Sequence, residues 1–290
     1  MKVLILLCSY HHKSTQKVAH AVSEILDATV LSPRDVNPEE LAHYDLISFG
    51  SGIYDYTHHK LLLELAEKKK LKIMVDHTFL YTGAVRKIKQ LIEDNVLGDL
   101  YYFDSIRVNL GLFQHDVNVV WDLAAHDISI MDYLIDERPQ AVSASGAGHF
   151  GRGLEDIAYL TFYYGRNIIA HINVNWLSPV KVRMTLIGGQ KKMLVWNDLE
   201  PDEKIKIYDK GVQVRTKEGK YNLLVDYRSG DMWSPKLEQT EALKAMVEAF
   251  VDYVENGGTV VNDGIAGLNV VKMLTAANQS LNNKNQTVYL

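Results

Sequence analysis

The chain has 290 residues, enough for two domains, because a single hydrophobic core stops growing at about 250 to 300 residues. Hydrophobic residues make up 47% and charged residues 23%, ordinary proportions that exclude an extensively disordered or fibrous protein. The net charge of -5 is spread along the chain without a basic stripe, so we do not expect a nucleic-acid partner.

The single cysteine, Cys8, has no partner for a disulfide within the chain, which favours a reducing cytoplasm. It ends an apolar run over residues 3–8 that is too short for a signal peptide and lacks a small-residue cleavage site. No later stretch approaches the roughly 18 apolar residues of a membrane span. We therefore expect a cytoplasmic protein without a membrane partner.

Short elements alternate along the first part of the chain. A buried strand over residues 3–8 is followed by a helix over residues 14–26. The elements expected next are strands over 28–31 and 45–49, a turn or short helix over 38–41, a helix over 60–70 and a strand over 71–75. This alternation predicts an α/β layer with a parallel sheet, of flavodoxin-like or Rossmann-like type.

From residue 83 onward the elements become longer. We expect helices over 83–92 and 119–134, with a strand rich in β-branched and aromatic residues over 100–110 between them. The elements expected after these are strands over 158–164, 168–176, 181–187 and 192–196 and helices over 241–255 and 263–281. The pattern predicts an α+β domain with a large, mostly antiparallel sheet, through which the chain forms a homo-oligomer.

The loop over residues 9–15 connects the first strand to the first helix, where backbone N–H groups and the helix dipole favour an anion. It has neither the G-x-G-x-x-G spacing nor the P-loop spacing, which excludes both of these nucleotide motifs. Its hydroxyls, on Ser9, Ser14 and Thr15, are candidate phosphate-binding groups. An ordinary turn between strand and helix is the alternative.

Several histidines follow strands of the expected parallel sheet. Because loops after parallel strands open at one edge, these imidazoles are expected to converge there. They are His11, His12, His58, His59 and His77. No pair with i, i+4 spacing and no nearby cysteine fixes a coordination geometry, so we predict no metal site.

Asp122 and His126 lie four residues apart on a predicted helix, a spacing that places them on one face. A carboxylate beside an imidazole can tune a general base, and oxidation of a sugar carbinol requires removal of its hydroxyl proton. The alternative interpretation is an exposed ion pair without a chemical role.

Residues 1–67 resemble the flavodoxin-like family, in which a Ser/Thr-rich turn after the first strand binds the flavin phosphate. Ser9, Ser14 and Thr15 match that turn, and residues 50–54 fall where the family lines the flavin ring. The resemblance implies FMN as a cofactor, with Tyr54 stacked on its ring. A third flavin loop has no counterpart in this chain.

Residues 61–290 resemble the substrate domain of the glucose-fructose oxidoreductase, inositol dehydrogenase and MocA family (Gfo/Idh/MocA). Within it, the dehydrogenases of sugar nucleotides such as UDP-N-acetylglucosamine derivatives are most similar. The matching segments are residues 77–81, Gly98-Asp99 with the strand that follows, 107–109, Asp122 with His126, and Trp176 with Ser178 and Pro179.

This second resemblance assigns roles to particular side chains. It implies that His126 is the active-site histidine and that Asp122 contacts or orients the substrate. It also implies that the substrate, a sugar or sugar nucleotide, lies near Arg107, Asn109 and Trp176.

Two motifs of that family are absent from this sequence, the glycine-rich fingerprint and the Glu-Lys-Pro motif whose lysine binds the reacting hydroxyl. Without the glycines a pyrophosphate cannot approach the backbone closely, and without the lysine the proton chemistry loses its electrostatic partner. NAD binding is therefore not expected, and dehydrogenase activity should be weak or lost.

The two resemblances meet in a helix near residues 61–70, whose apolar face suits either fold. We therefore predict a flavodoxin-like half domain over residues 1–77 and a Gfo/Idh/MocA-type substrate and oligomerisation domain over residues 78–290. A natural recombination and a laboratory chimera both fit this arrangement. The function hypotheses are a weak or silent sugar dehydrogenase, an FMN-binding oxidoreductase, and a non-catalytic sugar-nucleotide binder or scaffold.

Overall fold

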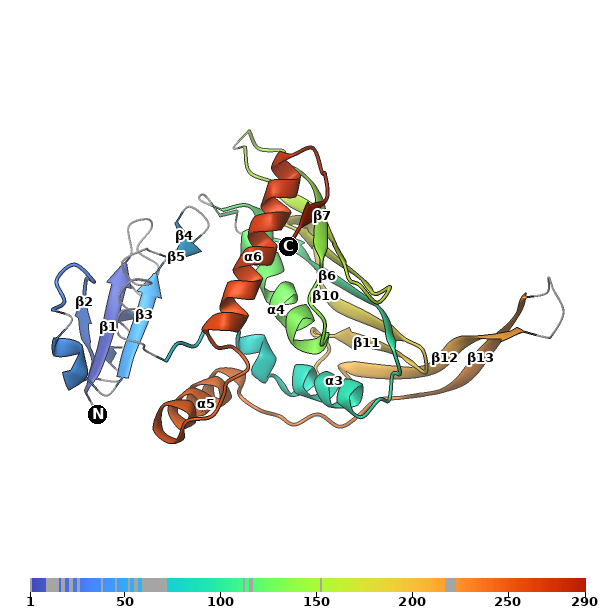
Figure 1. The fold of residues 1–290 in the computed structure, drawn as a ribbon, viewed down its shortest axis with the longest axis horizontal. Helices are drawn as coiled ribbons and strands as arrows, with labels where there is room; N and C mark the ends of the chain where they lie inside the picture. The colour runs from blue at the N-terminus through green and yellow to red at the C-terminus, as the bar shows by residue number, and fades with distance from the viewer. Residues whose placement is uncertain are drawn as a thin grey trace. The chain divides into compact units, whose positions relative to one another are not determined.

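The computed structural model describes residues 2–8, 16, 19–20, 23–24, 27–37, 39–44, 46–51, 53–54, 57–58, 72–111, 113–114, 117–151, 153–216 and 223–290. The chain divides into two compact units, Met1–Ile73 and Met74–Leu290, and each is described by itself (Figure 1). None of the described helices has the length and apolarity needed to traverse a bilayer.

The first unit contains a three-stranded parallel sheet in the order β2-β1-β3. Its strands are β1 (Val3–Cys8), β2 (Thr29–Leu31) and β3 (Leu46–Ser51), and the short 3-10 helix η1 (Glu40–His43) precedes β3. Leu4 and Leu6 of β1 are fully buried and pack with Leu41. The apolar run at the start of the chain is thus the central strand, and the predicted parallel sheet is confirmed.

Other predictions for this unit have mixed outcomes. Described residues within 14–26 are helical, and a short hairpin of β4 (Ile53–Tyr54) and β5 (Thr57–His58) follows β3. The expected helix over 60–70 lies outside the described residues. The predicted strand over 71–75 is wrong in its described part, because Met74 forms only an isolated bridge with Asp263.

The second unit is built on a nine-stranded mixed sheet in the order β13-β12-β11-β10-β6-β9-β8-β7-β14. Neighbouring strands are antiparallel except β6 and β9, which are parallel, so the predicted predominance of antiparallel pairs is confirmed. The strands are β6 (Leu100–Leu110), β7 (Ala141–Ala147), β8 (Ile157–Tyr163), β9 (Ile169–Asn175), β10 (Leu177–Gly189), β11 (Met193–Asn197), β12 (Ile205–Thr216), β13 (Leu223–Trp233) and β14 (Val288–Tyr289).

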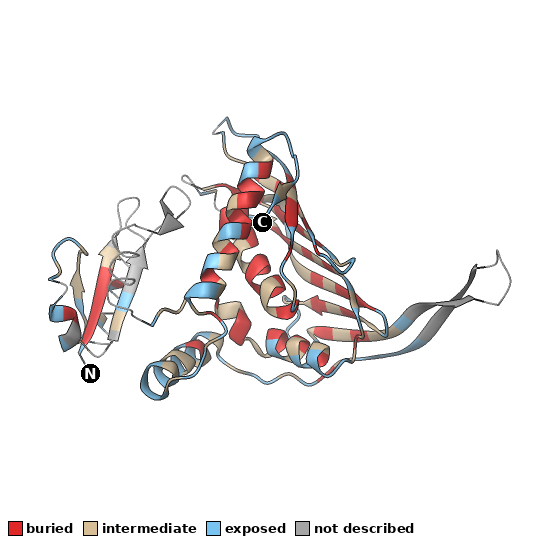
Figure 2. Cartoon of the chain, viewed as in Figure 1, coloured by how far each residue is buried: buried red, intermediate tan, exposed pale blue. Residues whose placement is uncertain are grey.

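Helices lie against one face of this sheet, where α6 packs on β7 and α4 packs on α6 (Figure 1). The helical elements are η2 (Thr78–Tyr81), α3 (Gly83–Glu93), the π-helical turn η3 (Val120–Ala124), α4 (Ala125–Leu134), α5 (Ala242–Asn256) and α6 (Gly264–Asn282). Buried residues alternate with more exposed ones along the strands, as in Leu160 and Phe162 of β8 against Tyr159 and Tyr163 (Figure 2). The core therefore lies between the sheet and the helices.

The helix predicted over 119–134 is confirmed, but its residues 120–124 form the π-helical turn η3. Such turns are uncommon and are often found at functional sites. Asp122 lies in η3, while His126 lies in the first turn of α4.

Candidate functional site

Two neutral side chains contact the carboxylate of Asp122. Trp176, which directly follows β9, donates its indole Nε1–H to Asp122 Oδ2 over 2.9 Å, and Gln114 Nε2 lies 3.4 Å from Oδ1. Trp176 is only 2% exposed, so its N–H needs an acceptor inside the protein. These contacts fix the direction of the Asp122 carboxylate while leaving the residue partly accessible.

Gly111 allows two candidate residues, Asn109 and Trp176, to lie close together. Its N–H donates to the Trp176 carbonyl over 3.1 Å. A Cβ atom at this position would lie 3.0 Å from Trp176 Cδ1 and 3.3 Å from Asn109 Oδ1. The absence of a side chain therefore lets Asn109, at the end of β6, lie beside the indole that holds Asp122.

The imidazole of His126 packs against an aromatic ring. Its centroid lies 5.2 Å from that of Phe79, with the rings tilted by 60°. Burial, and then the positive charge of Arg107, lower the pKa of His126 below its ordinary value of 6.5. The ring is therefore neutral at pH 7 and can accept a proton at nitrogen.

Arg107 is engaged in a buried ion pair. Its Nε lies 2.6 Å from Asp127 Oδ2, its Nη2 lies 3.2 Å from Oδ1, and Ser105 Oγ donates to Oδ1 over 2.7 Å. The guanidinium also lies over the Phe79 ring, 4.7 Å from its centroid. Arg107 is thus held beside Phe79, the ring that packs against His126. Its predicted contact with a substrate stays a prediction.

His77 lies close enough to His126 for their charges to interact. Burial, and then the charge of His126, lower the pKa of His77 to about 4. His77 is 8% exposed, and its Nε2 has no hydrogen-bond partner within the described part of the chain. Both imidazoles are therefore neutral at pH 7.

The structure thus places the predicted C-terminal residues in two adjoining clusters. One joins Asp122, Trp176 and Asn109, and the other joins His126 and Arg107 through Phe79. The predicted roles of these residues stay predictions. Sequence reasoning gave no role to Asp127 or to the aromatic residues Phe79, Phe113 and Phe150. Two of these carried a signal that could have been followed, because Asp127 is adjacent in sequence to His126 and Phe79 lies in the matching segment 77–81.

The N-terminal candidates cannot be placed in the same way. Ser9, Ser14 and Thr15 lie outside the described residues, and so does the side chain of Tyr54. The same holds for His11, His12 and His59 and for the imidazole of His58, so the predicted convergence of histidines stays a prediction. Among the residues that are described, no group of three or more His, Cys, Asp or Glu side chains could hold a metal ion.

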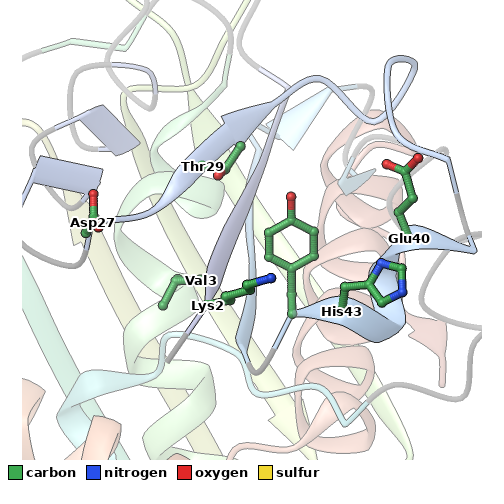
Figure 3. A pocket seen from close by; sticks show the side chains of 7 residues that line it. Lys2, Val3, Asp27, Thr29, Glu40 and His43 are labelled. Carbon is green, nitrogen blue, oxygen red and sulfur yellow. The ribbon is translucent and has the colours of Figure 1, made fainter.

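The first unit contains a cavity of about 390 Å³ (Figure 3). Val3 and Thr29, which line it, begin β1 and β2, so the cavity lies at the amino ends of the strands. The other lining residues are Lys2, Asp27, Glu40, His43 and Tyr44. Cofactors of parallel α/β sheets bind at the carboxyl ends, so this cavity is not a candidate cofactor site.

Comparisons with known proteins agree with this architecture. Residues 85–195 match the family model described as the GFO/IDH/MocA C-terminal domain. A curated relative, the uncharacterized protein MJ0298 of Methanocaldococcus jannaschii, is 44% identical over 68 residues, which are 23% of this chain and 45% of that protein. The chain thus spans less than half the length of this relative.

Solved oxidoreductases share the fold over nearly the whole length. UDP-N-acetylglucosamine 3-dehydrogenase GnnA from Acidithiobacillus ferrooxidans superimposes with a TM-score of 0.69 and 17% identity, covering 99% of each chain. Aldose-aldose oxidoreductase from Caulobacter crescentus gives a TM-score of 0.73 at 11% identity, covering 100% of this chain and 99% of that one. Residues 85–195 are therefore similar to the GFO/IDH/MocA C-terminal domain, and the chain has the fold of these oxidoreductases.

Proposed function

We propose that residues 74–290 bind a sugar-type ligand beside Asp122 and His126, and that the chain carries out little or no NAD-dependent hydride transfer. The observation that carries the proposal is the Asp122 carboxylate, which Trp176 Nε1 holds at 2.9 Å one turn before a neutral imidazole. Carboxylate oxygens accept hydrogen bonds from sugar hydroxyls, and a neutral imidazole can accept a hydroxyl proton. The fold shared with sugar oxidoreductases supports the same ligand class.

The chain's own residues do not fit NAD. Dinucleotide-binding sheets of the Rossmann type have the strand order 3-2-1-4-5-6 with a glycine-rich turn after the first strand. Here the order is β2-β1-β3, and the sequence after β1 is Ser-Tyr-His-His-Lys-Ser-Thr. We therefore assign no hydride-transfer step to Asp122 or His126.

Calorimetry tests the ligand-binding part of the proposal. UDP-N-acetylglucosamine is titrated into the wild-type protein, into Asp122→Asn and into Asp231→Asn, a control on an exposed carboxylate of β13. We expect binding to the wild type and to the control, and binding weakened about tenfold or more in Asp122→Asn, because a hydrogen bond to a charged group contributes about 1.5 to 3 kcal/mol. Equal affinity in all three proteins would refute the assignment.

The first unit offers a second candidate function, FMN binding. The order β2-β1-β3 supports it, because the flavodoxin-like sheet begins 2-1-3 and binds FMN at the β1/β3 switch point. Under this proposal residues 1–77 are a flavodoxin-like half domain, with a phosphate on Ser9, Ser14 and Thr15 and the ring beside Tyr54. A flavin absorption spectrum in the purified protein, lost in Ser14→Ala, would support it; a colourless protein that binds no added FMN rules it out.

Self-association through the large sheet is the remaining partner proposal. Tyr159 and Tyr163 of β8 and Ile169 of β9 lie on the same face and are 44%, 40% and 45% exposed. Neighbouring residues of these strands face the helices and are buried. Sedimentation of the wild type as a dimer or larger assembly, and of Tyr163→Glu as a monomer, is the expected result; a monomeric wild type contradicts the proposal.

A further inference from the structure

A row of aromatic rings runs outward from the candidate site. The ring of Phe113 lies 5.5 Å from Trp176 and 4.9 Å from Phe150, in edge-to-face arrangements with both. Trp176 is buried, Phe113 is half-buried, and Phe150 is 55% exposed. The row therefore connects the indole that holds Asp122 to an aromatic ring that faces solvent.

Hydrogen bonds hold the loop that carries Phe150 in place. His149, its immediate neighbour, bonds to the buried carboxylate of Asp156 twice, through its backbone N–H and through Nδ1, both at 2.7 Å. The Asp156 carbonyl accepts from the Trp176 N–H over 3.0 Å. The loop of Phe150 is thus connected, through His149 and Asp156, to the backbone N–H of Trp176, whose indole orients Asp122.

The start of η3 is hydrogen-bonded to the same loop. Val119 N–H donates to the Glu155 carbonyl over 2.9 Å, and Asn118 Nδ2 donates to Glu155 Oε2 over 2.7 Å. Asn118 is 2% exposed, so these contacts are shielded from water. The loop from β7 to β8 and the turn that carries Asp122 therefore hold fixed positions relative to each other.

The exposed ring of Phe150 offers apolar surface to a ligand, and removing apolar surface from water is favourable. A sugar ring fits this position, because it has an apolar C–H face that packs on an aromatic ring and hydroxyls that donate to a carboxylate. We propose that Phe150, held edge-to-face by Phe113, is a stacking platform that binds the apolar face of a monosaccharide ring while a hydroxyl of that ring donates to Asp122. This inference rests on the proposed function and adds the residues that select the ligand.

The test uses the full chain and three probes: N-acetylglucosamine, UDP-N-acetylglucosamine and UMP. Calorimetry is performed on the wild type, on Phe150→Ala and on Tyr101→Ala, a control whose ring is similarly exposed at 51% on β6. We expect Phe150→Ala to weaken binding of the probes that contain a sugar ring by about threefold to tenfold, the effect of one aromatic contact, and Tyr101→Ala to have none.

Proton NMR of the bound probe gives a second readout that a merely structural role would not change. C–H protons of the hexose ring should shift upfield in the wild type, because they lie over a phenyl ring, and this shift should be absent in Phe150→Ala. Thermal unfolding checks that the variant is folded; should Phe150→Ala be destabilised, Phe150→Leu replaces it.

Each outcome of the titrations tests either the stacking platform or the proposed function. Sugar binding that is unchanged in Phe150→Ala overturns the platform and leaves the proposed function intact. An effect of Phe150→Ala on UMP alone overturns the assignment to a sugar ring. A wild type that binds none of the probes refutes the proposed function, and the platform with it.

Discussion

Two carboxylates lie five residues apart on the same helical segment, and their surroundings differ. Asp127 is 2% exposed and receives two bonds from Arg107 and one from Ser105. Asp122 is partly exposed and is held by the neutral groups of Trp176 and Gln114. A buried carboxylate that is paired with a cation serves stability, whereas a partly exposed carboxylate whose direction is fixed by an indole N–H can accept hydrogen bonds from a ligand.

The largest effect that this comparison predicts is on stability. Asp127→Asn keeps the shape of the side chain but leaves Arg107 buried without a counter-charge, so the free energy of unfolding should fall by about 3 to 5 kcal/mol. Denaturant unfolding of this variant beside Asp122→Asn measures the difference, since Asp122→Asn should cost no more than about 1.5 kcal/mol. Equal losses of unfolding free energy in the two variants would contradict the distinction between a structural Asp127 and a ligand-binding Asp122.

The two buried imidazoles predict a dependence of stability on pH. The pKa of His77 is lowered to about 4 in the folded protein, and that of His126 is also lowered, so the unfolded chain binds protons more readily. The free energy of unfolding should therefore fall as the pH decreases from about 6.5 to 4, by about 3 kcal/mol for His77. Unfolding of the wild type and His77→Gln at pH 7 and about pH 4.5 measures this loss, which should be smaller in the variant; an identical loss contradicts the account.

The comparison also predicts an effect on binding that is separable from stability. Asp122→Asn should weaken the binding of UDP-N-acetylglucosamine about 10-fold to 100-fold, because the amide lacks the charge that strengthens a hydrogen bond to a hydroxyl. Its unfolding midpoint should stay close to that of Asp231→Asn. A variant that binds normally but unfolds early would show that Asp122 serves structure, as Asp127 does.

The smallest predicted effect concerns the close approach of the Trp176 indole to the backbone of Gly111. In Gly111→Ala the new Cβ would lie 3.0 Å from Trp176 Cδ1, so the indole must move by a few tenths of an ångström. We expect a loss of about 1 kcal/mol in stability and a weaker contact between Trp176 and Asp122. Thermal unfolding and calorimetry on the same sample measure both effects; unchanged stability and binding would show that Gly111 is not needed for the approach.

The spacing of apolar residues in the sequence was sufficient to predict much of the fold. The strand predicted over residues 100–110 is confirmed residue for residue as β6, and the two helices at the end of the chain are confirmed as α5 and α6. The hairpin of β12 and β13 was not predicted, because lysine, glutamine, arginine and glycine interrupt its apolar residues. The strand expected over 71–75 failed because the backbone of Val75 bonds to Asn262.

The candidate site was predictable only in part. The four-residue spacing of Asp122 and His126 predicted that both lie on one helical segment, which is confirmed, but the π-helical turn that carries Asp122 was not foreseen. The bond from Trp176 to Asp122 joins residues 54 positions apart, and that from Arg107 to Asp127 joins residues 20 apart. Such contacts depend on how η3 and α4 pack against the ends of the strands, which no local pattern specifies.

The central claim, a sugar-type site without a nicotinamide site, is tested most directly by two parallel titrations of the wild-type protein. UDP-N-acetylglucosamine should give a saturable heat of binding, and NAD should bind no more tightly than about millimolar. Micromolar affinity for NAD together with no binding of the sugar nucleotide would contradict the account.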